Sequence, residues 1–321
     1  MSNRDSYLRV ATFNTQYATP NSTWFDAGSP VPAPRRTDNQ RSSRERAFIA
    51  AIRQLVTCEP DVVVLEELDV HQARSGRVNL ARLAARTLAE YGFGEAWFAP
   101  MFVGSVRALR LPPSLLCSSL VPAGTVRIPG FGLLIASREP LTQVRVIRLP
   151  RPWPRFSFGT KPPYLSLTVE GARVALAATL RGRDVNIAAT HLAFRQPVAA
   201  RQLTYLWESL RGTMRHRIIA GDLNMRAEDV TMTLRAGTLT SGVSITDAPT
   251  FPSHAPRLDL DHIVHASPIG SPGDFSLGSP IATLTNTEVL HLPISDHRAL
   301  VTDVHVAQHH LNTSRSGVCE R

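Results

Sequence analysis

Six short apolar runs in this 321-residue chain each end on acidic, amide or imidazole side chains. The clearest is RIIAGDLN at residues 217–224, where the apolar residues predict a buried strand and Gly221 predicts a turn. Asp222 and Asn224 are expected on the loop beyond that strand. A lone pattern of this kind indicates no more than an Asp/Asn turn. Its recurrence favours an α/β enzyme, because such enzymes place their chemistry at the ends of buried strands.

The other five runs deliver the same kinds of side chain. They end on Asn14, on Glu66 and Glu67, on His191, on Asp261, and on Asp296 with His297. The corresponding strands are predicted at 8–14, 61–69, 185–190 and 258–265, with a closing strand at 299–306. Alternation within 258–265 places Asp259 and Asp261 on one face. A histidine at a strand end, such as His191, is more often structural than catalytic when taken alone. The functional prediction therefore depends on the six polar strand ends together.

The adjacent carboxylates at 66 and 67 are the most informative pair. Like charges repel, so two neighbouring carboxylates are costly unless water or a cation compensates them. A solvated strand end would give the pair no function, whereas a hard-metal site would use the oxygen ligands that Mg²⁺ prefers. Strand alternation places one of the two on the side of the site, and we assign that position to Glu67.

Composition narrows the class of partner. The formal net charge is +9 and the pI is near 10.4, which suits an anionic partner such as nucleic acid. Lys161 is the only lysine, so 35 − 1 = 34 basic residues are arginine, as a codon bias toward G·C would also produce. Three cysteines without a C-x-x-C spacing argue against a disulfide scaffold and fit a reducing compartment. We expect a cytoplasmic monomer without a transmembrane segment or a secretory signal.

The chain reads as one domain over residues 1–306, with irregular insertions at 17–41 and 101–129 and a disordered tail at 307–321. Helices are predicted at 42–56, 78–89, 199–211 and 226–236, and further strands at 131–137, 145–149, 164–169 and 172–178. Ser42 and Glu45 form a capping-box pattern, and residues 182–184 predict a hairpin turn. The segment at 151–161 mixes cations with aromatics, which is typical both of nucleic-acid binding and of proline-rich turns between strands.

Taken in order, TFN (12–14), LEE (65–67), THL (190–192), GDLN (221–224), LDHI (260–263) and SDH (295–297) resemble the endonuclease/exonuclease/phosphatase, or DNase I-like, superfamily. The resemblance spans about residues 7 to 306. It implies an α/β fold, a four-layer α/β sandwich with two mostly antiparallel sheets face to face and helices on both outer sides. Two departures stand out: many relatives have Gln where this chain has Glu66, and GFG at 130–132 replaces the usual GNA.

The resemblance also implies roles for the polar residues. Asn14 and Glu67 match residues at a metal, with Asp296 as a further ligand. His297 matches a histidine that contacts the scissile phosphate, and Asp261 matches the acid that orients it. Asp222 and Asn224 match the pair that positions or deprotonates the attacking water, and His191 matches a second phosphate-contacting or acid histidine.

These residues suit phosphate-ester hydrolysis on chemical grounds as well. The reaction must deliver water to an anionic phosphorus and stabilise charge on the leaving oxygen. A carboxylate such as Asp222 can accept the proton of water, and His297 can neutralise a phosphate oxygen if Asp261 keeps it protonated. We expect Asp261 and His297 to meet as the ends of neighbouring strands in one sheet.

The sequence therefore predicts a Mg²⁺-dependent phosphoesterase, with Mn²⁺ as an alternative metal. A DNA or RNA nuclease is the first hypothesis. A phosphatase or phosphodiesterase acting on a small molecule or lipid head group is the second, and a catalytically silent binding module on the same fold is the third.

Overall fold

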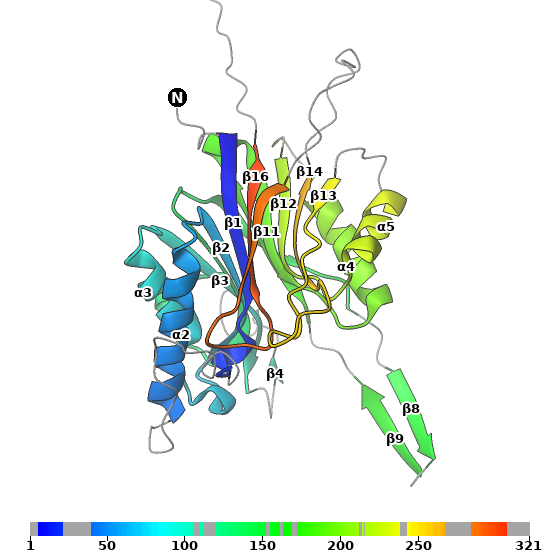
Figure 1. The fold of residues 1–321 in the computed structure, drawn as a ribbon. Coiled ribbons are helices and arrows are strands. Elements are labelled where there is room, and N and C mark those ends of the chain that lie inside the picture. The colour runs from blue at the N-terminus through cyan, green and yellow to red at the C-terminus, as the bar shows by residue number, and fades with distance from the viewer. Residues whose placement is uncertain are drawn as a thin grey trace, which may run out of the picture.

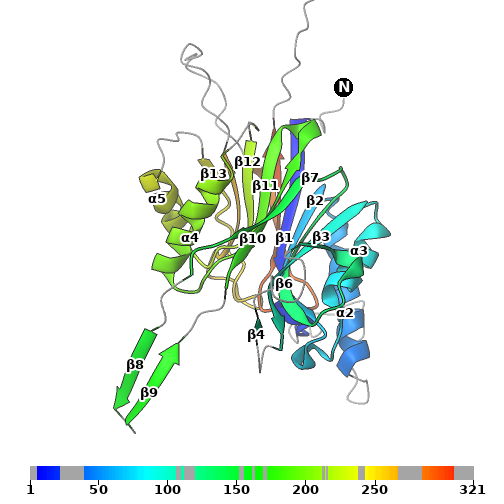
Figure 2. The same ribbon diagram turned by 180° about the vertical axis from the view of Figure 1, so that it is seen from behind.

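Two β-sheets lie face to face in the computed structural model, and a pair of helices covers the outer side of each (Figures 1 and 2). The structure describes residues 6–21, 40–105, 110–111, 120–151, 155–160, 163–168, 172–211, 214, 216–237, 243–266 and 284–306. The four layers confirm the α/β sandwich expected from the sequence.

The first sheet contains eight strands. It runs through β15 (Leu284–Leu290), β16 (Ala299–His305), β1 (Tyr7–Asn14), β2 (Val62–Val70), β6 (Gly130–Ser137), β3 (Glu95–Gly104) and β4 (Arg110–Leu111), with β5 (Val121–Pro122) paired to β3. Strands β1 and β2 are parallel, whereas β16 is antiparallel to β1. Because of these directions, the end of β1, the part of β2 around Glu66 and the start of β16 lie at the same end of the sandwich.

The second sheet contains six strands. Its order is β13 (Val243–Ile245), β14 (Asp261–Ala266), β12 (His216–Asp222), β11 (Val185–His191), β10 (Val174–Leu180) and β7 (Thr142–Arg148). Here β11 and β12 are parallel and β14 is antiparallel to β12. This register places the ends of β11 and β12 beside the start of β14. The mostly antiparallel pairing of both sheets agrees with the expectation.

The core follows from alternation along the strands. In β2, Val62 and Val64 belong to the buried cluster between the two sheets, whereas Val63 and Leu65 pack toward the helices. The second sheet packs on its own helices through a third cluster that contains the fully buried Trp207. Each sheet thus has one face in the central core and one face under helices, which explains why most strand positions are apolar.

Among the described residues, four α-helices form the outer layers. They are α2 (Gln40–Val56) and α3 (Leu80–Ala89) on the eight-stranded sheet, and α4 (Gln196–Ser209) and α5 (Ala227–Gly237) on the six-stranded sheet. Helix α3 begins after Asn79, whose side chain accepts a hydrogen bond from the backbone N–H of Arg82. Within the described residues, no helix combines the length and the hydrophobicity that crossing a lipid bilayer requires.

A separate two-stranded ribbon, β8 (Arg155–Thr160) paired with β9 (Pro163–Thr168), projects from the body of the sandwich (Figure 1). It extends from the end at which β1 and β12 finish, and the view from behind agrees (Figure 2). Much of the 151–161 segment is thus a strand.

Several local expectations are wrong. Ser42 does not cap α2, because the helix already begins at Gln40 and Ser42 lies inside it. The region 101–129 is not wholly irregular, since β3 continues into it and β4 and β5 lie within it. Strands β3, β8, β13 and β15 were not expected. The hairpin between β10 and β11 is confirmed, with Asp184 in the left-handed region at φ 54°. Residues 22–39, 112–119 and 307–321 lie outside the described residues.

Candidate active site

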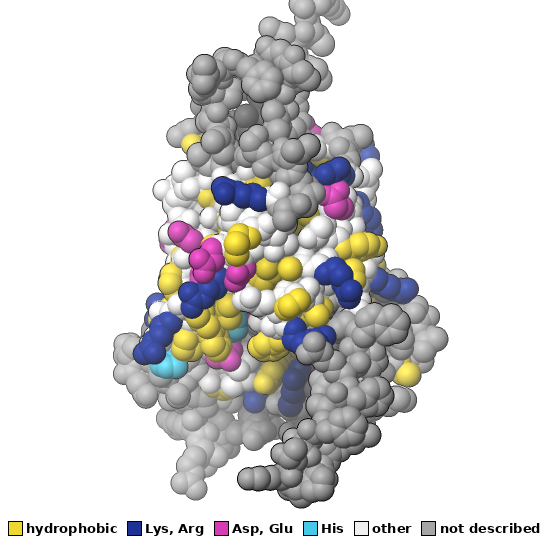
Figure 3. Space-filling model, turned by 90° about the vertical axis from the view of Figure 1, so that its right-hand side faces the viewer, with side chains coloured by type: hydrophobic (Ala, Val, Ile, Leu, Met, Phe, Trp, Pro, Cys, Tyr) yellow, Lys and Arg dark blue, Asp and Glu magenta, His cyan; other side chains and the backbone are white. Residues whose placement is uncertain are grey.

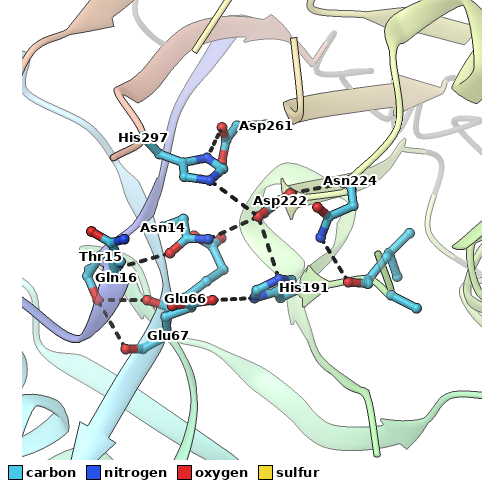
Figure 4. Close-up of polar contacts among 12 residues, drawn as sticks. Asn14, Thr15, Gln16, Glu66, Glu67, His191, Asp222, Asn224, Asp261 and His297 are labelled. Atoms are coloured by element: carbon cyan, nitrogen blue, oxygen red, sulfur yellow. Dashed lines mark hydrogen bonds and ion pairs between the residues drawn. The ribbon is translucent and has the colours of Figure 1, made fainter. Parts of the chain in front are cut away.

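Polar side chains from both sheets meet at one end of the sandwich (Figure 4). The six-stranded sheet contributes the ends of three adjacent strands, because His191 is opposite Asp222 in register and Asp222 is opposite Asp261. The eight-stranded sheet contributes Asn14 beside Glu66, while His297 lies just before β16. The sequence residues that ended separate apolar runs are thus brought together.

Asp222 lies at the centre of this group. Its Oδ2 accepts a 2.9 Å hydrogen bond from Asn14 Nδ2, which comes from the opposite sheet. The same oxygen lies 3.5 Å from His191 Nε2 and 3.9 Å from His297 Nε2. Both separations are too long for strong hydrogen bonds, so the two imidazoles face Asp222 without being fully satisfied by it. Nε2 of His191 and Nε2 of His297 can therefore each form a hydrogen bond with a bound group.

Asp261 and His297 form the tightest charged pair of the site, with 2.7 Å between Asp261 Oδ2 and His297 Nδ1. The Thr250 hydroxyl donates a second hydrogen bond to the same oxygen at 2.5 Å. Burial opposes protonation of His297, but the charge of Asp261 and its hydrogen bond outweigh burial and raise the histidine pKa to about 10. His297 is therefore an imidazolium at neutral pH.

The expected pairing of Asp261 and His297 within one sheet is wrong. Asp261 begins β14 in the six-stranded sheet, whereas His297 precedes β16 in the eight-stranded sheet. Their contact crosses the sandwich. Alternation and strand order along the chain do not show which of two sheets a strand joins, so the sequence could not place Asp261 and His297 in different sheets.

Glu66 and Glu67 both reach the site, contrary to the expectation that alternation would select one. A β-bulge between Leu65 and Leu68 interrupts the pairing with β6, and Glu67 adopts a left-handed φ of 57°. Glu66 is fully buried on the inter-sheet side, where the Thr12 hydroxyl donates to its Oε1 at 2.7 Å. The bulge turns Glu67 toward His191, with 3.8 Å between Glu67 Oε1 and His191 Nδ1.

The two carboxylates lie in a strongly acidic environment. Burial, and then the nearby charges of Asp261 and Asp222, raise the pKa of Glu66 well above its usual value, although the Thr12 bond acts the other way. Burial and the charge of Asp222 raise the pKa of Glu67 to about 7. A cation at this end of the sandwich would relieve this repulsion.

His191 has the opposite behaviour. Burial, the positive charge of Arg173 and the charge of His297 lower its pKa to about 3, against the opposing effect of Asp222. Both ring nitrogens are buried without a hydrogen-bond partner among the described residues. The site thus holds a neutral imidazole and a charged one on either side of Asp222.

Gly221 and Asn224 position Asp222. The expected turn at Gly221 is wrong, because β12 continues through Gly221 to Asp222. A Cβ at Gly221 would lie 1.8 Å from the Thr190 carbonyl oxygen, so glycine is needed for the close approach of β11. Asn224, at φ 51°, donates its backbone N–H to Asp222 Oδ1 at 2.9 Å, and its side chain donates to the Leu192 carbonyl at 3.1 Å.

The backbone after Asn14 is also unusual. Gln16, Tyr17 and Ala18 have φ values of 42°, 45° and 58°, a short left-handed turn that costs roughly 1–2 kcal/mol per residue. The Gln16 N–H donates to Asn14 Oδ1 at 3.1 Å, and the Arg44 guanidinium donates to the carbonyls of Tyr17 and Ala18. Strained backbone held by such contacts is typical of functional sites.

Asp296 lies in the loop that carries His297 and is only partly buried. Burial raises its pKa, and the charge of His297 opposes that shift. The charges of Asp222 and Asp261 also raise its pKa, so Asp296 lies near these carboxylates, at the border of the site.

The residues fit a divalent cation. Glu66 Oε2 and Asp261 Oδ1 are buried without hydrogen-bond partners among the described residues. Carboxylate oxygens of Asp222 and Asp261 lie within 4.8 Å of each other, and the His297 imidazolium faces the same space without offering a ligand atom. Carboxylate and amide oxygens predominate, which suits Mg²⁺ or Mn²⁺.

Sequence reasoning missed three contributors to the site. Thr12 and Thr250 fix the buried carboxylates, and Arg173 acts electrostatically on His191 and Glu67. Thr12 lies within the TFN motif and shares a strand face with Asn14, so its position could have been inferred. Thr250 and Arg173 carry no local signal, because only the packing of distant segments places them here.

Comparison with known proteins identifies a family whose model matches most of the chain. Residues 11–297 match the model of the Endonuclease/Exonuclease/phosphatase family. No curated protein sequence matches the chain significantly.

Solved structures share the fold at low sequence identity. An endonuclease/exonuclease/phosphatase from Beutenbergia cavernae DSM 12333 is 21% identical, with a TM-score of 0.57, and the match covers 94% of this chain and 72% of that one. The human Nocturnin catalytic domain with bound sulfate is 18% identical, with a TM-score of 0.55 and 96% of each chain covered. A mannosyl-6-phosphatase from Bacteroides thetaiotaomicron VPI-5482 is 10% identical, with a TM-score of 0.53, and the match covers 92% and 99% of the two chains.

Proposed function

Because the chain belongs to the Endonuclease/Exonuclease/phosphatase family, whose members are phosphoesterase hydrolases, we propose that it is a Mg²⁺-dependent phosphodiesterase that cleaves nucleic acid. The observation that carries the proposal is the meeting of a charged imidazole, a neutral imidazole and the Asp222 carboxylate, none of which fully satisfies the others. Such a group suits a substrate that is anionic and must be attacked by water.

The cation would be held by oxygen atoms of Glu67 and Asn14, with Asp296 at the border of the site. When bound, it would supply charge neutralisation to the phosphate and the leaving oxygen. The raised pKa of Glu67, about 7, supports this assignment, because a buried carboxylate with an acidic neighbour is stabilised as an anion by a cation.

The protein side chains divide the remaining work. Asp261 orients His297 and keeps it protonated, so that Nε2 can donate to a non-bridging phosphate oxygen. Asp222 is placed by Asn14 and by the Asn224 N–H, and its carboxylate can accept the proton of the attacking water. In this arrangement Asn224 positions the Asp222 carboxylate and the Leu192 carbonyl.

His191 completes the group as a neutral imidazole. Its pKa of about 3 makes it a hydrogen-bond donor and acceptor at neutral pH, not a cation. It can therefore contact a phosphate oxygen or the attacking water without adding charge. Nucleic acid is favoured as the substrate by the net charge of +9.

The test is hydrolysis across a substrate panel with purified protein. The panel contains single-stranded and plasmid DNA, RNA, phosphoinositides and sphingomyelin, each assayed with Mg²⁺, with Mn²⁺ and in excess EDTA. The proposal expects cleavage of a nucleic acid that EDTA abolishes and Mg²⁺ restores. Full activity in EDTA would overturn the metal assignment, and hydrolysis of only a lipid or small-molecule ester would overturn the nucleic-acid assignment.

A further inference from the structure

An exposed aromatic side chain stands next to the site, on the segment that joins β11 to α4. Phe194 has 77% of its surface exposed, more than any other large hydrophobic residue in the described part of the chain. It follows His191 by three residues, a span of at most about 11 Å even in a fully extended chain. A large apolar ring is thus held in solvent close to the reacting group.

The backbone that carries Phe194 is fixed by the site itself. The Leu192 N–H donates to the Asp222 carbonyl at 2.9 Å, and the Leu192 carbonyl accepts from Asn224 Nδ2 at 3.1 Å. The next residue, Ala193, donates its N–H to Gln202 Oε1 at 3.0 Å. These bonds fix the two residues between His191 and Phe194, so the backbone that leads to Phe194 is held in place relative to the site.

Arg173 lies on the neighbouring strand segment. The antiparallel register that pairs Ala175 with Thr190, extended by two residues, places Arg173 opposite Leu192 at the same end of the sheet. Its positive charge lowers the pKa of both His191 and Glu67, which locates it near both groups. A cation and an aromatic ring therefore flank His191 from adjacent backbone segments.

We propose that Phe194 and Arg173 form a subsite for the nucleotide next to the scissile phosphodiester. The base stacks on the Phe194 ring, and Arg173 pairs with the phosphate of that nucleotide. The inference rests on the proposed nucleic-acid substrate and deepens it by naming the contact that holds the strand.

The chemistry favours a nucleobase over other apolar ligands. A ring beside a cation is the combination with which proteins bind single strands, because every base has a π-face and every nucleotide a phosphate. The face that carries α4 and α5 shows basic and acidic side chains interspersed with hydrophobic ones (Figure 3). Because Phe194 is at most about 11 Å from His191 along the chain, the subsite would hold the nucleotide that adjoins the scissile bond.

The test uses a single-stranded oligonucleotide with one cleavable phosphodiester, every other linkage being a phosphorothioate. In one version the nucleotides flanking that bond carry bases, and in the other they are abasic. The values of kcat/KM are measured with Mg²⁺ for the wild type, Phe194→Ala and Phe194→Trp. Tyr205→Ala and Met232→Ala serve as matched controls, because these residues are also exposed hydrophobics, on α4 and α5.

On the substrate with bases, Phe194→Ala is expected to lose roughly 5- to 150-fold in kcat/KM, the range that stacking of one base supports. On the abasic substrate the same variant should stay within about twofold of the wild type. Phe194→Trp should retain the base-dependent rate, and the two controls should match the wild type on both substrates. Equal losses by Phe194→Ala on both substrates, or no loss on either, would overturn the subsite.

The contribution of Arg173 is tested separately, through the salt dependence of kcat/KM. Arg173→Gln should reduce the slope of log kcat/KM against log salt by about one unit, whether or not bases are present. An unchanged slope would remove Arg173 from the subsite. Wild-type cleavage of the oligonucleotide with an unchanged Phe194→Ala rate would leave the proposed function standing and this inference wrong, whereas no wild-type cleavage at all would overturn both.

Discussion

The hydrogen bond from His297 to Asp261, 2.7 Å between Nδ1 and Oδ2, joins the two sheets of the sandwich. One partner precedes the first residue of β16 and the other begins β14. The charge that is proposed to hold the phosphate therefore depends on how the two sheets pack. A substitution elsewhere that shifts one sheet against the other would therefore break the contact between Asp261 and His297, although both residues are still present.

This pairing predicts non-additive loss of activity. Asp261→Asn and His297→Gln should each lower kcat/KM by at least about 100-fold, as loss of a positioned proton-transfer or charge-stabilising group does. The double variant should be little worse than the worse single one, because groups that act as a unit are not additive. The measurement is kcat/KM for the four proteins on one phosphodiester. Multiplicative losses, or a near wild-type Asp261→Asn, would show that the residues act independently.

The same pair predicts how stability depends on pH. The folded pKa of His297, about 10, is above the ordinary histidine pKa of 6.5, so the folded state binds more protons than the unfolded state between these values. The stabilisation is fully present below pH 6.5 and is lost as pH rises through about 10. Denaturant unfolding in EDTA at several pH values from 6 to 10.5 measures it. His297→Gln should flatten the decline, and an equally steep decline in that variant would contradict the assignment.

Gly221 gives a prediction about packing. A methyl group there would approach the Thr190 carbonyl to 1.8 Å, and the glycine φ of 146° disfavours other residues. Gly221→Ala should therefore destabilise the protein by more than about 2 kcal/mol. Gly94→Ala is the matched control, since a Cβ at Gly94 meets nothing within 4 Å. Chemical denaturation of both variants tests this, and similar stabilities would show that β12 can move away from β11.

Much of the architecture was accessible from the sequence because it depends on local pattern. The apolar runs predicted most strands and helical periodicity predicted the four α-helices of the described residues. The four-layer sandwich was implied by the resemblance of the ordered motifs to a known superfamily. The polar residues that end those runs do meet, since parallel neighbours such as β1 and β2 finish at one edge.

What could not be predicted depends on geometry that pattern does not encode. The bulge at 65–68 breaks alternation, so Glu66 and Glu67 both reach the site. Asp259, expected beside Asp261 on one strand face, instead lies before β14 and accepts a hydrogen bond from the Ala227 N–H at the start of α5. Long-range packing likewise decides that Asp261 and His297 belong to different sheets.

The most direct measurement of the central claim is the effect of Asp222→Asn on phosphodiester hydrolysis in Mg²⁺. Asn keeps an oxygen for the Asn14 contact but cannot accept the proton of water, so kcat should fall by about 10²- to 10⁴-fold. Asp247→Asn, which changes an exposed carboxylate, should leave kcat unchanged. Equal thermal unfolding of the two variants would show that the loss is catalytic. An Asp222→Asn protein within about threefold of the wild-type kcat would contradict a water-activating role for this carboxylate, and with it the assignment of this end of the sandwich as the active site.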